Sequence, residues 1–433
     1  MAAENTRRAA ILGANRIPFG KAGGAYEGVN NLDMLTAALD GLVARFNLQG
    51  ERLGDVSAGA VLKHSRDFNL AREAVLGTAL DPHTPAFDVQ RACATSMEAT
   101  WAIANKITLG QIESGIAAGV DSTSDAPIVV SDRLRRTLMK LSRAKTAGQK
   151  LKLISSIRPK DLAPVAPSVN EPRTHLSMGE HQALTTAERD ITREEQDAIA
   201  LASHQNLAAT YDRGFFDDLM TPYRGLTRDE SLREDTSAEK LASLKPAFGK
   251  RGANPSMTAG NSTPLSDGAA TVLLGTPEWG AERGLTPLAY FVDAEVAAVD
   301  FVHGSEGLLM SGAYAVPRLL HRQGLGLNDF DFIEIHEAFA STVLTTMQAW
   351  ADEEFNQKTF GRPALGEVDR SRLNVAGSSL AAGHPFAATG ARIVGTLAHL
   401  LAEKKQETGT PARGLISVCA AGGQATAMII EAA

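Results

Sequence analysis

The sequence of 433 residues predicts an α/β fold in which short apolar strands alternate with amphipathic helices. Three observations support this class. Strands and helices alternate from about residue 9 to residue 431, and the second half of the chain repeats the order of the first half. A stretch from about residue 126 to residue 254 has no counterpart in that repeat. We therefore expect two related α/β halves with an insertion between parts of the first.

The elements of the first half follow from apolar periodicity and from turn residues. Residues 9–12 are predicted to form a strand that runs into Gly13, and Asn31 is expected to cap a helix. Apolar residues recur at helical spacing along that helix, and Gly50 ends the connection after it. The other expected elements are strands at 56–62, 87–90, 115–120 and 267–274, a helix around 69–76, and a helix from Ser96 to the stop at Gly110.

The second half contains the same elements in the same order. Residues 327–332 resemble residues 53–56, and both segments lead into a predicted strand. An ancient duplication explains this order, and chance similarity between α/β units is the competing explanation. The expected elements are helices at 313–322, from near Ala338 and at 388–405, and strands at 332–335, 373–375, 415–418 and 425–431.

The insertion, residues 126–254, is predicted to be mostly helical. Its segment 131–161 is strongly basic and carries apolar residues at helical spacing, which predicts two amphipathic helices around Gly148. This hairpin is either a solvated basic face or a contact with a membrane surface or a partner subunit. A further helix is expected between residues 191 and 210. The predicted units are therefore 1–125 with 255–280, the insertion 126–254, and 281–433.

Composition and charge exclude some classes of protein. Apolar residues make up 44% of the chain and charged residues 21%, and the net charge of −7 argues against a general nucleic-acid binder. No apolar run approaches the length of a membrane span. Residues 1–8 lack the apolar core of a signal peptide, and residues 431–433 carry no peroxisomal address. We expect a cytoplasmic protein.

Cys93 is the first candidate reactive residue. It lies in the turn between a predicted strand and a predicted helix, where free backbone N–H groups and the helix dipole stabilise a thiolate. The alternative is a small packed side chain, which most free cysteines are. The chain has only one other cysteine, Cys419. A disulfide between them is formally possible, but such sparse use fits a reducing compartment better.

Three later residues of suitable chemistry also follow predicted strands. His336, His384 and Cys419 each stand beside small residues at a strand end or in a tight turn, where α/β sheets bind ligands. Each one alone could be structural: a hydrogen-bonded core histidine, a turn residue or packing. Together with Cys93 they suggest a cysteine nucleophile with a histidine base and a second proton carrier. Metal binding is a weaker explanation, because no two candidate ligands have the close spacing of zinc sites.

Four motifs in this order resemble the thiolase family along essentially the whole chain. They are Cys93-Ala94-Thr95-Ser96, His336-Glu337-Ala338-Phe339, Gly383-His384-Pro385 and Cys419-Ala420-Ala421-Gly422-Gly423. The segment 261–270 matches a further family segment. With His at position 336, Gly-His-Pro-Phe-Ala-Ala-Thr-Gly at 383–390 and the basic insertion, the chain is most similar to β subunits of fatty-acid oxidation (trifunctional) complexes. The resemblance implies duplicated βαβαβαββ halves in a five-layer αβαβα core.

The resemblance also implies a reaction and a role for each residue. His384 would take the proton of Cys93, which would attack the keto carbon of a 3-ketoacyl-CoA and keep the shortened acyl group. Cys419 would protonate the released enolate to give acetyl-CoA, and a second CoA would remove the acyl group. The enolate oxygen would be held by His384 and by a water positioned from His336. Backbone N–H groups of Cys93 and Ala421 would form the oxyanion hole.

The resemblance implies that the insertion, residues 126–254, covers a coenzyme A site, with contacts at three positions. Arg233 aligns with a position near the nucleotide phosphate, and Met178 and Thr263 align with positions along the pantetheine path. The segment Met178-Gly179-Glu180-His181-Gln182 departs from the family's usual Met-Gly-x-Thr-Ala. Ala421 and Ala425 stand where many members have Gly, so the shape of that loop is in question.

The resemblance sets the expected partners and the alternatives. CoA and acyl-CoA would be substrates, with no permanently bound cofactor and no metal. A homo-oligomer (dimer or tetramer) is implied, with a hydratase/dehydrogenase α subunit or a membrane as partner of residues 131–161. The alternatives are an acetyltransferase that forms acetoacetyl-CoA, a ketoacyl synthase, and a non-catalytic CoA- or lipid-binding scaffold. A ketoacyl synthase has no need of Cys419.

Overall fold

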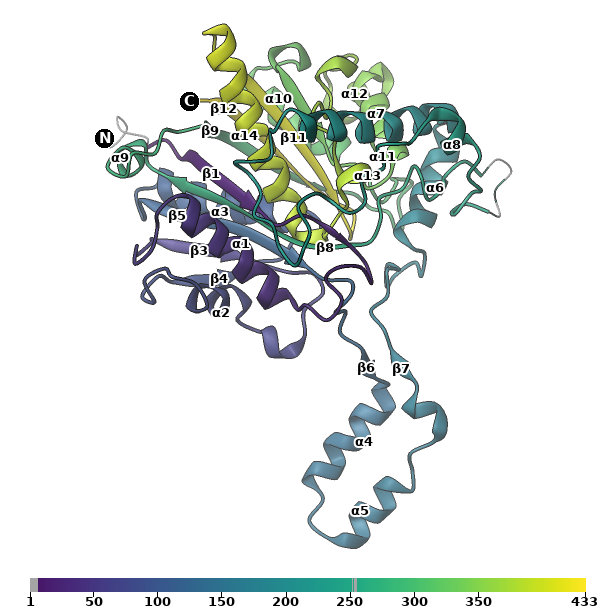
Figure 1. The fold of residues 1–433 in the computed structure, drawn as a ribbon. Helices are drawn as coiled ribbons and strands as arrows, with labels where there is room; N and C mark the ends of the chain where they lie inside the picture. The colour runs from purple at the N-terminus through teal and green to yellow at the C-terminus, as the bar shows by residue number, and fades with distance from the viewer. Residues whose placement is uncertain (1–6, 251, 253–254) are drawn as a thin grey trace.

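The computed structural model describes residues 7–250, 252 and 255–433. Their main feature is a sheet of ten strands, in which two similar halves are joined where β1 pairs with β9 (Figure 1). The strands of the first half are β1 (Ala10–Arg16), β2 (Gly20–Lys21), β3 (Asp55–Ala58), β4 (Ala86–Asp88), β5 (Ser114–Asp121) and β8 (Ser266–Gly275). Those of the second half are β9 (Ala289–Ala298), β10 (Phe332–Ile335), β11 (Arg413–Ala420) and β12 (Gln424–Ala432).

The pairing of the strands repeats between the halves. In the first half the order is β4-β3-β5-β8-β1, with β3 parallel to β4 and β5, and β8 antiparallel to β5 and β1. In the second half β10 is parallel to β11, and β12 is antiparallel to β11 and β9. The same neighbours with the same directions favour the duplication over chance similarity. The predicted strand at 373–375 is wrong, because Leu373 makes only an isolated parallel bridge to Ile333.

Helices form layers on both sides of each half. On the outer faces, α1 (Asn31–Arg45) and α2 (Leu70–Leu76) pack on the first half, and α10 (Gly312–Gln323) and α11 (Ala340–Ala351) pack on the second. Between the halves lie α3 (Thr95–Thr108) and α14 (Thr389–Thr408), whose apolar side chains share one core with the inner faces of both halves (Figure 1). The expected five-layer αβαβα arrangement is confirmed.

The cap of α1 differs by one residue from the prediction. The side chain of Asn30 accepts a hydrogen bond from the backbone N–H of Asp33 at 2.9 Å, so Asn30 is the cap. Asn31 is the first helical residue, and its side-chain amide donates to the carbonyl of Leu62 instead. Further short helices are α9 (Pro277–Ala281), α12 (Glu353–Phe360) and α13 (Ser379–Ala382).

The basic segment forms a helical hairpin that projects from the rest of the molecule (Figure 1). Its helices are α4 (Asp132–Arg143) and α5 (Ala147–Ile154), on a ribbon of β6 (Val129–Val130) and β7 (Pro164–Val165). The break between the helices precedes Gly148, which lies inside α5, because Thr146 and Gln149 form a capping box. The prediction of two helices around Gly148 is therefore confirmed. No helix of the described residues has the length and apolar character needed to cross a bilayer.

The rest of the insertion lies against the second half. Its helices are α6 (Met178–Glu188), α7 (Arg193–Asp212) and α8 (Ala238–Ala242). Both α6 and α7 contact α11, and α7 also contacts α13. The predicted unit limits at residues 1 and 254 fall outside the described residues, as do the first six residues of the segment compared with signal peptides.

Candidate active site

Cys93 lies in a tight turn between β4 and α3. Ala92 adopts a φ of 43°, a strained conformation for a residue with a Cβ, and it is held by its neighbours. The hydroxyl of Thr95 accepts from the backbone N–H of Arg91 at 2.9 Å and donates to the carbonyl of Ala92 at 2.7 Å. Thr95 is the first residue of α3. The turn therefore presents the partly exposed Cys93 thiol at the start of that helix, as predicted.

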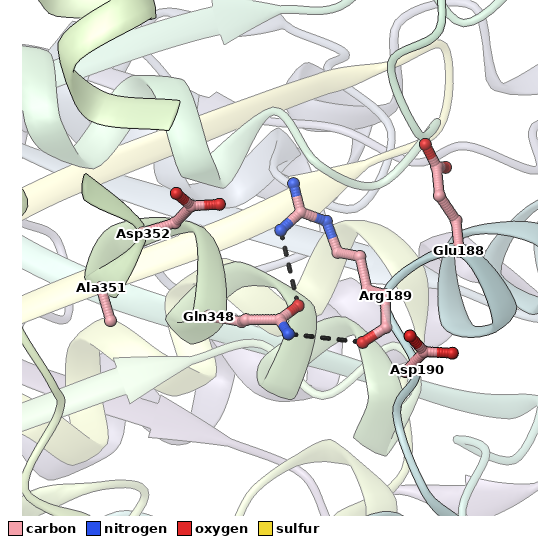
Figure 2. A pocket seen from close by; sticks show the side chains of 6 residues that line it. All are labelled: Glu188, Arg189, Asp190, Gln348, Ala351 and Asp352. Atoms are coloured by element: carbon pink, nitrogen blue, oxygen red, sulfur yellow. Dashed lines mark hydrogen bonds between the residues drawn. The ribbon is translucent and has the colours of Figure 1, made fainter. Parts of the chain in front are cut away.

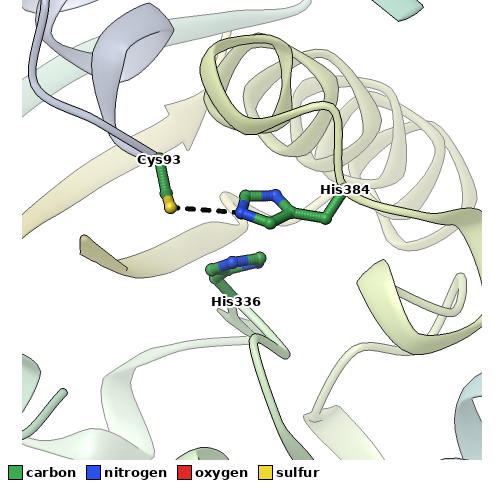
Figure 3. Close-up of side chains that lie close together, drawn as sticks. All are labelled: Cys93, His336 and His384. Carbon is green, nitrogen blue, oxygen red and sulfur yellow. Dashed lines mark hydrogen bonds between the residues drawn. The ribbon is translucent and has the colours of Figure 1, made fainter. Parts of the chain in front are cut away.

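His384 reaches Cys93 from the other half of the chain. Its Nε2 lies 3.1 Å from Cys93 Sγ (Figure 3). Its Nδ1 lies 2.6 Å from the hydroxyl of Thr389, the first residue of α14. The preceding Gly383 has a φ of 98°, and a Cβ there would lie 2.5 Å from Ser266 Oγ. That hydroxyl accepts from the backbone N–H of His384 at 3.2 Å. A glycine is therefore required to bring His384 into this position.

His336 is fully buried directly after β10. Its ring centre lies 4.2 Å from that of His384, and the two rings approach one another on the same side of Cys93 (Figure 3). Its Nδ1 is 2.9 Å from Ser379 Oγ, whereas Nε2 has no hydrogen-bond partner in the protein. The sulfur of Cys93 and a ring nitrogen of each histidine lie within 4.8 Å of one another. Spacing in the sequence gave no sign that these three groups could bind a metal ion, but the fold brings them together.

Cys419 occupies the end of β11, and its side chain is buried among apolar residues. The surrounding cluster is formed by Met257, Leu308, Leu309, Ala338 and Phe339, with Met178 packed against it. Both cysteines are free thiols, so the disulfide that was formally possible is not formed. Burial raises the pKa of Cys419, and the charge of a Cys93 thiolate raises it further. The two sulfurs are therefore close enough for the ionisation of one to affect the other.

The loop after Cys419 accommodates alanine at the two questioned positions. Ala421 does not adopt a positive φ, and Ala425 pairs regularly with Cys419 in the hairpin of β11 and β12. The positive φ values fall on Gly422 and Gly423, at 79° and 70°. The N–H of Gly422 donates to the buried carboxylate of Glu171 at 2.6 Å. The insertion therefore holds this loop in place.

Burial favours the uncharged forms of the nucleophile and the histidines. It raises the pKa of Cys93 to about 12, and the backbone N–H groups of Ala421 and Cys93 oppose this rise by favouring the thiolate. Burial, followed by the charge of Arg392, lowers the pKa of His384 to about 3. The pKa of His336 is also well below its usual value, through burial, His384 and Arg392. A neutral thiol beside a neutral imidazole is the resting pair.

The three predicted CoA contacts differ in their distance from this cluster. Thr263 lies beside the histidines: its hydroxyl donates to the carbonyl of Ser379 at 2.8 Å, and the side chain of Ser379 contacts His336. Met178 lies beside the Cys419 cluster at the start of α6. Arg233 is exposed, and its backbone N–H donates to His204 of α7. Within the described residues Arg233 forms no ion pair, whereas the neighbouring Arg228 pairs with Asp212 and Glu234.

Sequence reasoning missed the groups that support the histidines. Thr389 lies within the quoted Gly383–Gly390 motif, five residues after His384, and the helix start there was the available signal. Ser379 and Arg392 form a hydrogen-bonded pair next to His336. Glu337 is buried and accepts from Ser203 of α7, at 2.7 Å. The hydrogen bond between Ser203 and Glu337 forms because α7 of the insertion packs against α13.

Two surface pockets lie near the insertion. The first, of about 590 Å³, is lined by Glu188, Arg189, Asp190, Gln348, Ala351 and Asp352, and Figure 2 shows Gln348 hydrogen-bonded to Arg189. It contains none of the candidate catalytic residues. The second, of about 890 Å³, is lined in part by Ala183, Phe248 and Met257, which belong to the cluster around Cys419. The second pocket is therefore the one that adjoins the candidate chemistry.

Comparison with known proteins identifies the family. The model of the thiolase N-terminal domain matches residues 9–278, and that of the thiolase C-terminal domain matches residues 285–432. A 3-ketoacyl-CoA thiolase of Serratia proteamaculans is 43% identical over 431 residues, which cover 98% of this chain and 97% of the relative. One from Pectobacterium carotovorum is 42% identical, with 98% and 96% covered.

Solved structures agree over nearly the whole chain. The Bacillus anthracis acetyl-CoA acetyltransferase superposes with a TM-score of 0.81 at 30% identity, covering 99% of both chains. Human mitochondrial 3-ketoacyl-CoA thiolase in complex with CoA superposes with a TM-score of 0.79 at 26% identity, covering 99% of this chain and 98% of the other. With both domain models matched and the four motifs gathered around Cys93, the chain belongs to the thiolase family.

Proposed function

We propose that this thiolase, an acyltransferase, cleaves a 3-ketoacyl-CoA with CoA to give acetyl-CoA and a shortened acyl-CoA, through an acyl group on Cys93. The observation that carries the proposal is the 3.1 Å contact between Cys93 Sγ and His384 Nε2. A neutral imidazole at this distance can take the thiol proton as the sulfur attacks. Relatives that are 43% and 42% identical over 98% of this chain are named 3-ketoacyl-CoA thiolases.

The first half-reaction moves the acyl group to Cys93. His384 takes the thiol proton, Cys93 sulfur bonds to the keto carbon, and the carbon–carbon bond to the acetyl-CoA part breaks. The enolate carbon takes a proton from Cys419, which leaves a Cys419 thiolate. The backbone N–H groups of Cys93 and Ala421 favour negative charge at the Cys93 sulfur, where the oxyanion of the reacting carbonyl also forms. This supports our assignment of both groups as oxyanion donors.

The second half-reaction restores the enzyme. CoA gives its thiol proton to Cys419 and attacks the acyl carbonyl, and the bond to Cys93 breaks as His384 returns the proton to that sulfur. Two protons therefore leave cysteines and two return. CoA acts as a substrate in this scheme, and we place its pantetheine arm along Met178 and Thr263 and its phosphates at the unpaired Arg233.

The experiment that tests the function is acyl transfer followed by mass spectrometry. Incubation with acetyl-CoA should add an acetyl group to the peptide that contains Cys93, and addition of CoA should remove it. CoA-dependent cleavage measured across a ladder of 3-ketoacyl chain lengths then defines the substrate range. Turnover without any mass change at Cys93, or no turnover at any length, would refute the proposal. A scaffold that only binds CoA would give neither result.

The same site can run the reaction in the direction of condensation. Cys419 would then remove the α-proton of acetyl-CoA, and the enolate would attack acetyl-Cys93. The name of the Bacillus anthracis neighbour keeps this biosynthetic role as the second candidate. The ratio of the thiolysis rate to the condensation rate distinguishes the two. We favour degradation within fatty-acid oxidation, because relatives that are 41% and 42% identical to this chain are named 3-ketoacyl-CoA thiolases.

We also propose that the hairpin of α4 and α5 docks on an anionic partner, either a hydratase/dehydrogenase α subunit or an acidic membrane. Leu138, Met139, Leu151 and Ile154 are exposed on it among Lys and Arg side chains. Two measurements compare the full-length protein with a variant that lacks residues 131–164. Loss of co-purification with the α subunit identifies a protein partner, and loss of flotation with vesicles that contain phosphatidylserine identifies a membrane. If the deletion changes neither, the basic face is only solvated.

Three further proposals concern organisation. We propose the units 1–125 with 255–280, 126–254 and 281–433, supported by the repeated sheet order and by the lack of a counterpart to α4–α8 in the second half. We propose a homo-oligomer, a dimer or tetramer, which sedimentation would test. We propose a cytoplasmic location, supported by the two free thiols.

A further inference from the structure

Two side chains, Ser379 and Arg392, lie behind the ring of His336. Ser379 Oγ is 2.9 Å from His336 Nδ1, and the guanidinium of Arg392 donates to the same Oγ at 2.8 Å. All three side chains are buried, with exposures of 0%, 0% and 4% for His336, Ser379 and Arg392. Water is therefore kept from this chain of hydrogen bonds.

The direction of each bond follows from the chemistry of the donors. A guanidinium carries only N–H donors, so Ser379 Oγ must be the acceptor of its bond with Arg392. The hydroxyl then has its own proton to give, and the other group within hydrogen-bond distance is His336 Nδ1. An unprotonated Nδ1 accepts that proton. In a neutral imidazole the ring proton must then be on Nε2.

The opposite arrangement leaves buried groups without partners. If His336 carried its proton on Nδ1 and donated to Ser379, the hydroxyl proton of Ser379 would lose its acceptor. Nε2 would then be a bare acceptor in a site that must stabilise negative charge. This arrangement leaves two buried groups unpaired, the Ser379 hydroxyl proton and His336 Nε2, whereas the Nε2–H form leaves only Nε2–H without a partner in the protein. The opposite arrangement is therefore disfavoured.

We propose that Arg392 and Ser379 are positioning residues that hold His336 as the Nε2–H tautomer, so that it presents a hydrogen-bond donor to the oxygen of the reacting substrate or to a water bound to it. His336 Nε2 is buried and has no partner within the protein. The ring lies against His384, beside Cys93 (Figure 3). The catalytic part of this inference rests on the proposed thiolase reaction, whereas the tautomer can be measured without it.

The charge of Arg392 acts in the same direction. A buried cation beside two imidazoles disfavours their protonation, and it contributes to the low pKa values of both His336 and His384. Glu337 favours the charged form of Arg392, whereas Glu334, whose pKa burial raises to about 8, is uncharged at neutral pH. The histidines therefore stay neutral, as a specific tautomer requires.

Nitrogen-15 NMR of the full-length protein labelled at histidine tests the tautomer directly. The chain has ten histidines, and the signal lost in His336→Asn identifies the pair of nitrogens to be read. We expect the shift of Nε2 to be that of a protonated nitrogen and the shift of Nδ1 to be that of an unprotonated one. A protonated Nδ1, or a rapidly averaged pair of shifts, would overturn the inference.

Kinetics test the consequence with a matched pair of serines. Ser378 also accepts from Arg392, at 3.3 Å, but it has no bond to His336. Ser379→Ala should lower kcat for thiolysis roughly 10- to 100-fold, the scale of one misplaced donor to developing charge, with KM changed by less than about threefold. Ser378→Ala should stay within about threefold of wild type. In Ser379→Ala the NMR signal of His336 should change from the Nε2–H form to a mixture.

The outcomes separate this inference from the proposed function. Wild-type thiolysis with a protonated His336 Nδ1 overturns the positioning role and leaves the function intact. The expected tautomer in a protein without thiolase activity overturns the function alone. Equal losses in Ser378→Ala and Ser379→Ala would show a general packing effect and would overturn the positioning role.

Discussion

Cys93 Sγ and His384 Nε2 lie 3.1 Å apart although 291 positions separate them in the sequence. Each residue precedes the central helix of its half, α3 or α14, and the starts of these helices pack closely. A Cβ on Gly390 would lie 2.5 Å from the backbone nitrogen of Met97, and the N–H of Ala391 donates to Ser96 Oγ at 2.7 Å. The duplicated halves therefore each supply one member of the nucleophile–base pair.

The resting state of that pair can be read from the rate of Cys93 alkylation. Because burial raises the pKa of Cys93 to about 12, the thiolate fraction should keep growing with pH. The rate with iodoacetamide should rise about tenfold per pH unit up to about pH 10. The Cys419→Ala background ensures that only Cys93 reacts. A plateau near neutral pH would instead show a thiolate–imidazolium pair.

Replacement of the base should slow turnover without removing the thiol. His384→Asn keeps a polar side chain but cannot accept the proton, so thiolysis should fall by roughly 10²- to 10⁴-fold. Since the pKa of His384 is lowered to about 3, the wild-type imidazole stays unprotonated down to acidic pH. The loss should therefore be similar at about pH 6 and about pH 8. A loss confined to the lower pH would contradict this assignment.

Cys419→Ala should separate the two kinds of proton transfer. The variant keeps Cys93 and His384, so acetyl-CoA should still acetylate Cys93. It lacks the thiol that serves the enolate carbon, so exchange of the α-protons of acetyl-CoA with D₂O should be lost. Proton NMR of the recovered acetyl-CoA measures that exchange. Cys93→Ala is the control for the absence of acylation, and retained exchange in Cys419→Ala would exclude the role of Cys419.

Thr389 should matter through its hydroxyl alone. The hydroxyl lies 2.6 Å from His384 Nδ1, and the residue is fully buried. When it accepts from Nδ1–H, Nε2 is left free to take the proton of Cys93. Thr389→Val removes this partner at nearly unchanged volume and should lower kcat about tenfold or more, since an unpaired buried donor costs about 1–3 kcal/mol. Thr389→Ser should keep most of the activity; a similar loss in both variants would point to packing instead.

Glu334 should make the stability of the protein depend on pH. It is fully buried, neither carboxylate oxygen has a partner, and burial followed by Glu337 raises its pKa to about 8 against the opposing charge of Arg392. The unfolded value is 4.5, so the folded state prefers the protonated form. This contribution is complete below about pH 4.5 and is lost as pH rises through about 8.

Glu334→Gln removes that ionisation and should gain stability relative to wild type as pH rises across this window. Urea denaturation at about pH 5, 7 and 9 measures the difference, with at most about 1.4 kcal/mol per pH unit expected. Glu354→Gln, at an exposed carboxylate, should show no such trend. A constant difference between Glu334→Gln and wild type at all three values would show that Glu334 is ionised throughout.

The sequence by itself determined the elements and the chemical residues. Apolar periodicity located the strands and helices within a few residues, since burial of one face imposes it locally. Four motifs named Cys93, His336, His384 and Cys419, because the chemistry restricts which side chains can serve. The errors were at the cap of α1 and at residues 373–375. At the cap of α1 the neighbouring Asn30 is chemically equivalent to Asn31, and at residues 373–375 only an isolated bridge to Ile333 forms.

Only the tertiary structure decided how those residues work. The 3.1 Å approach of His384 to Cys93, and the pair of Ser379 and Arg392 behind His336, join segments whose separation in the sequence carries no signal. The tautomers and charge states also arise only on folding, because they depend on burial and on hydrogen-bond partners that the unfolded chain lacks. The sequence therefore identifies the reactive groups, and tertiary packing determines their protonation states.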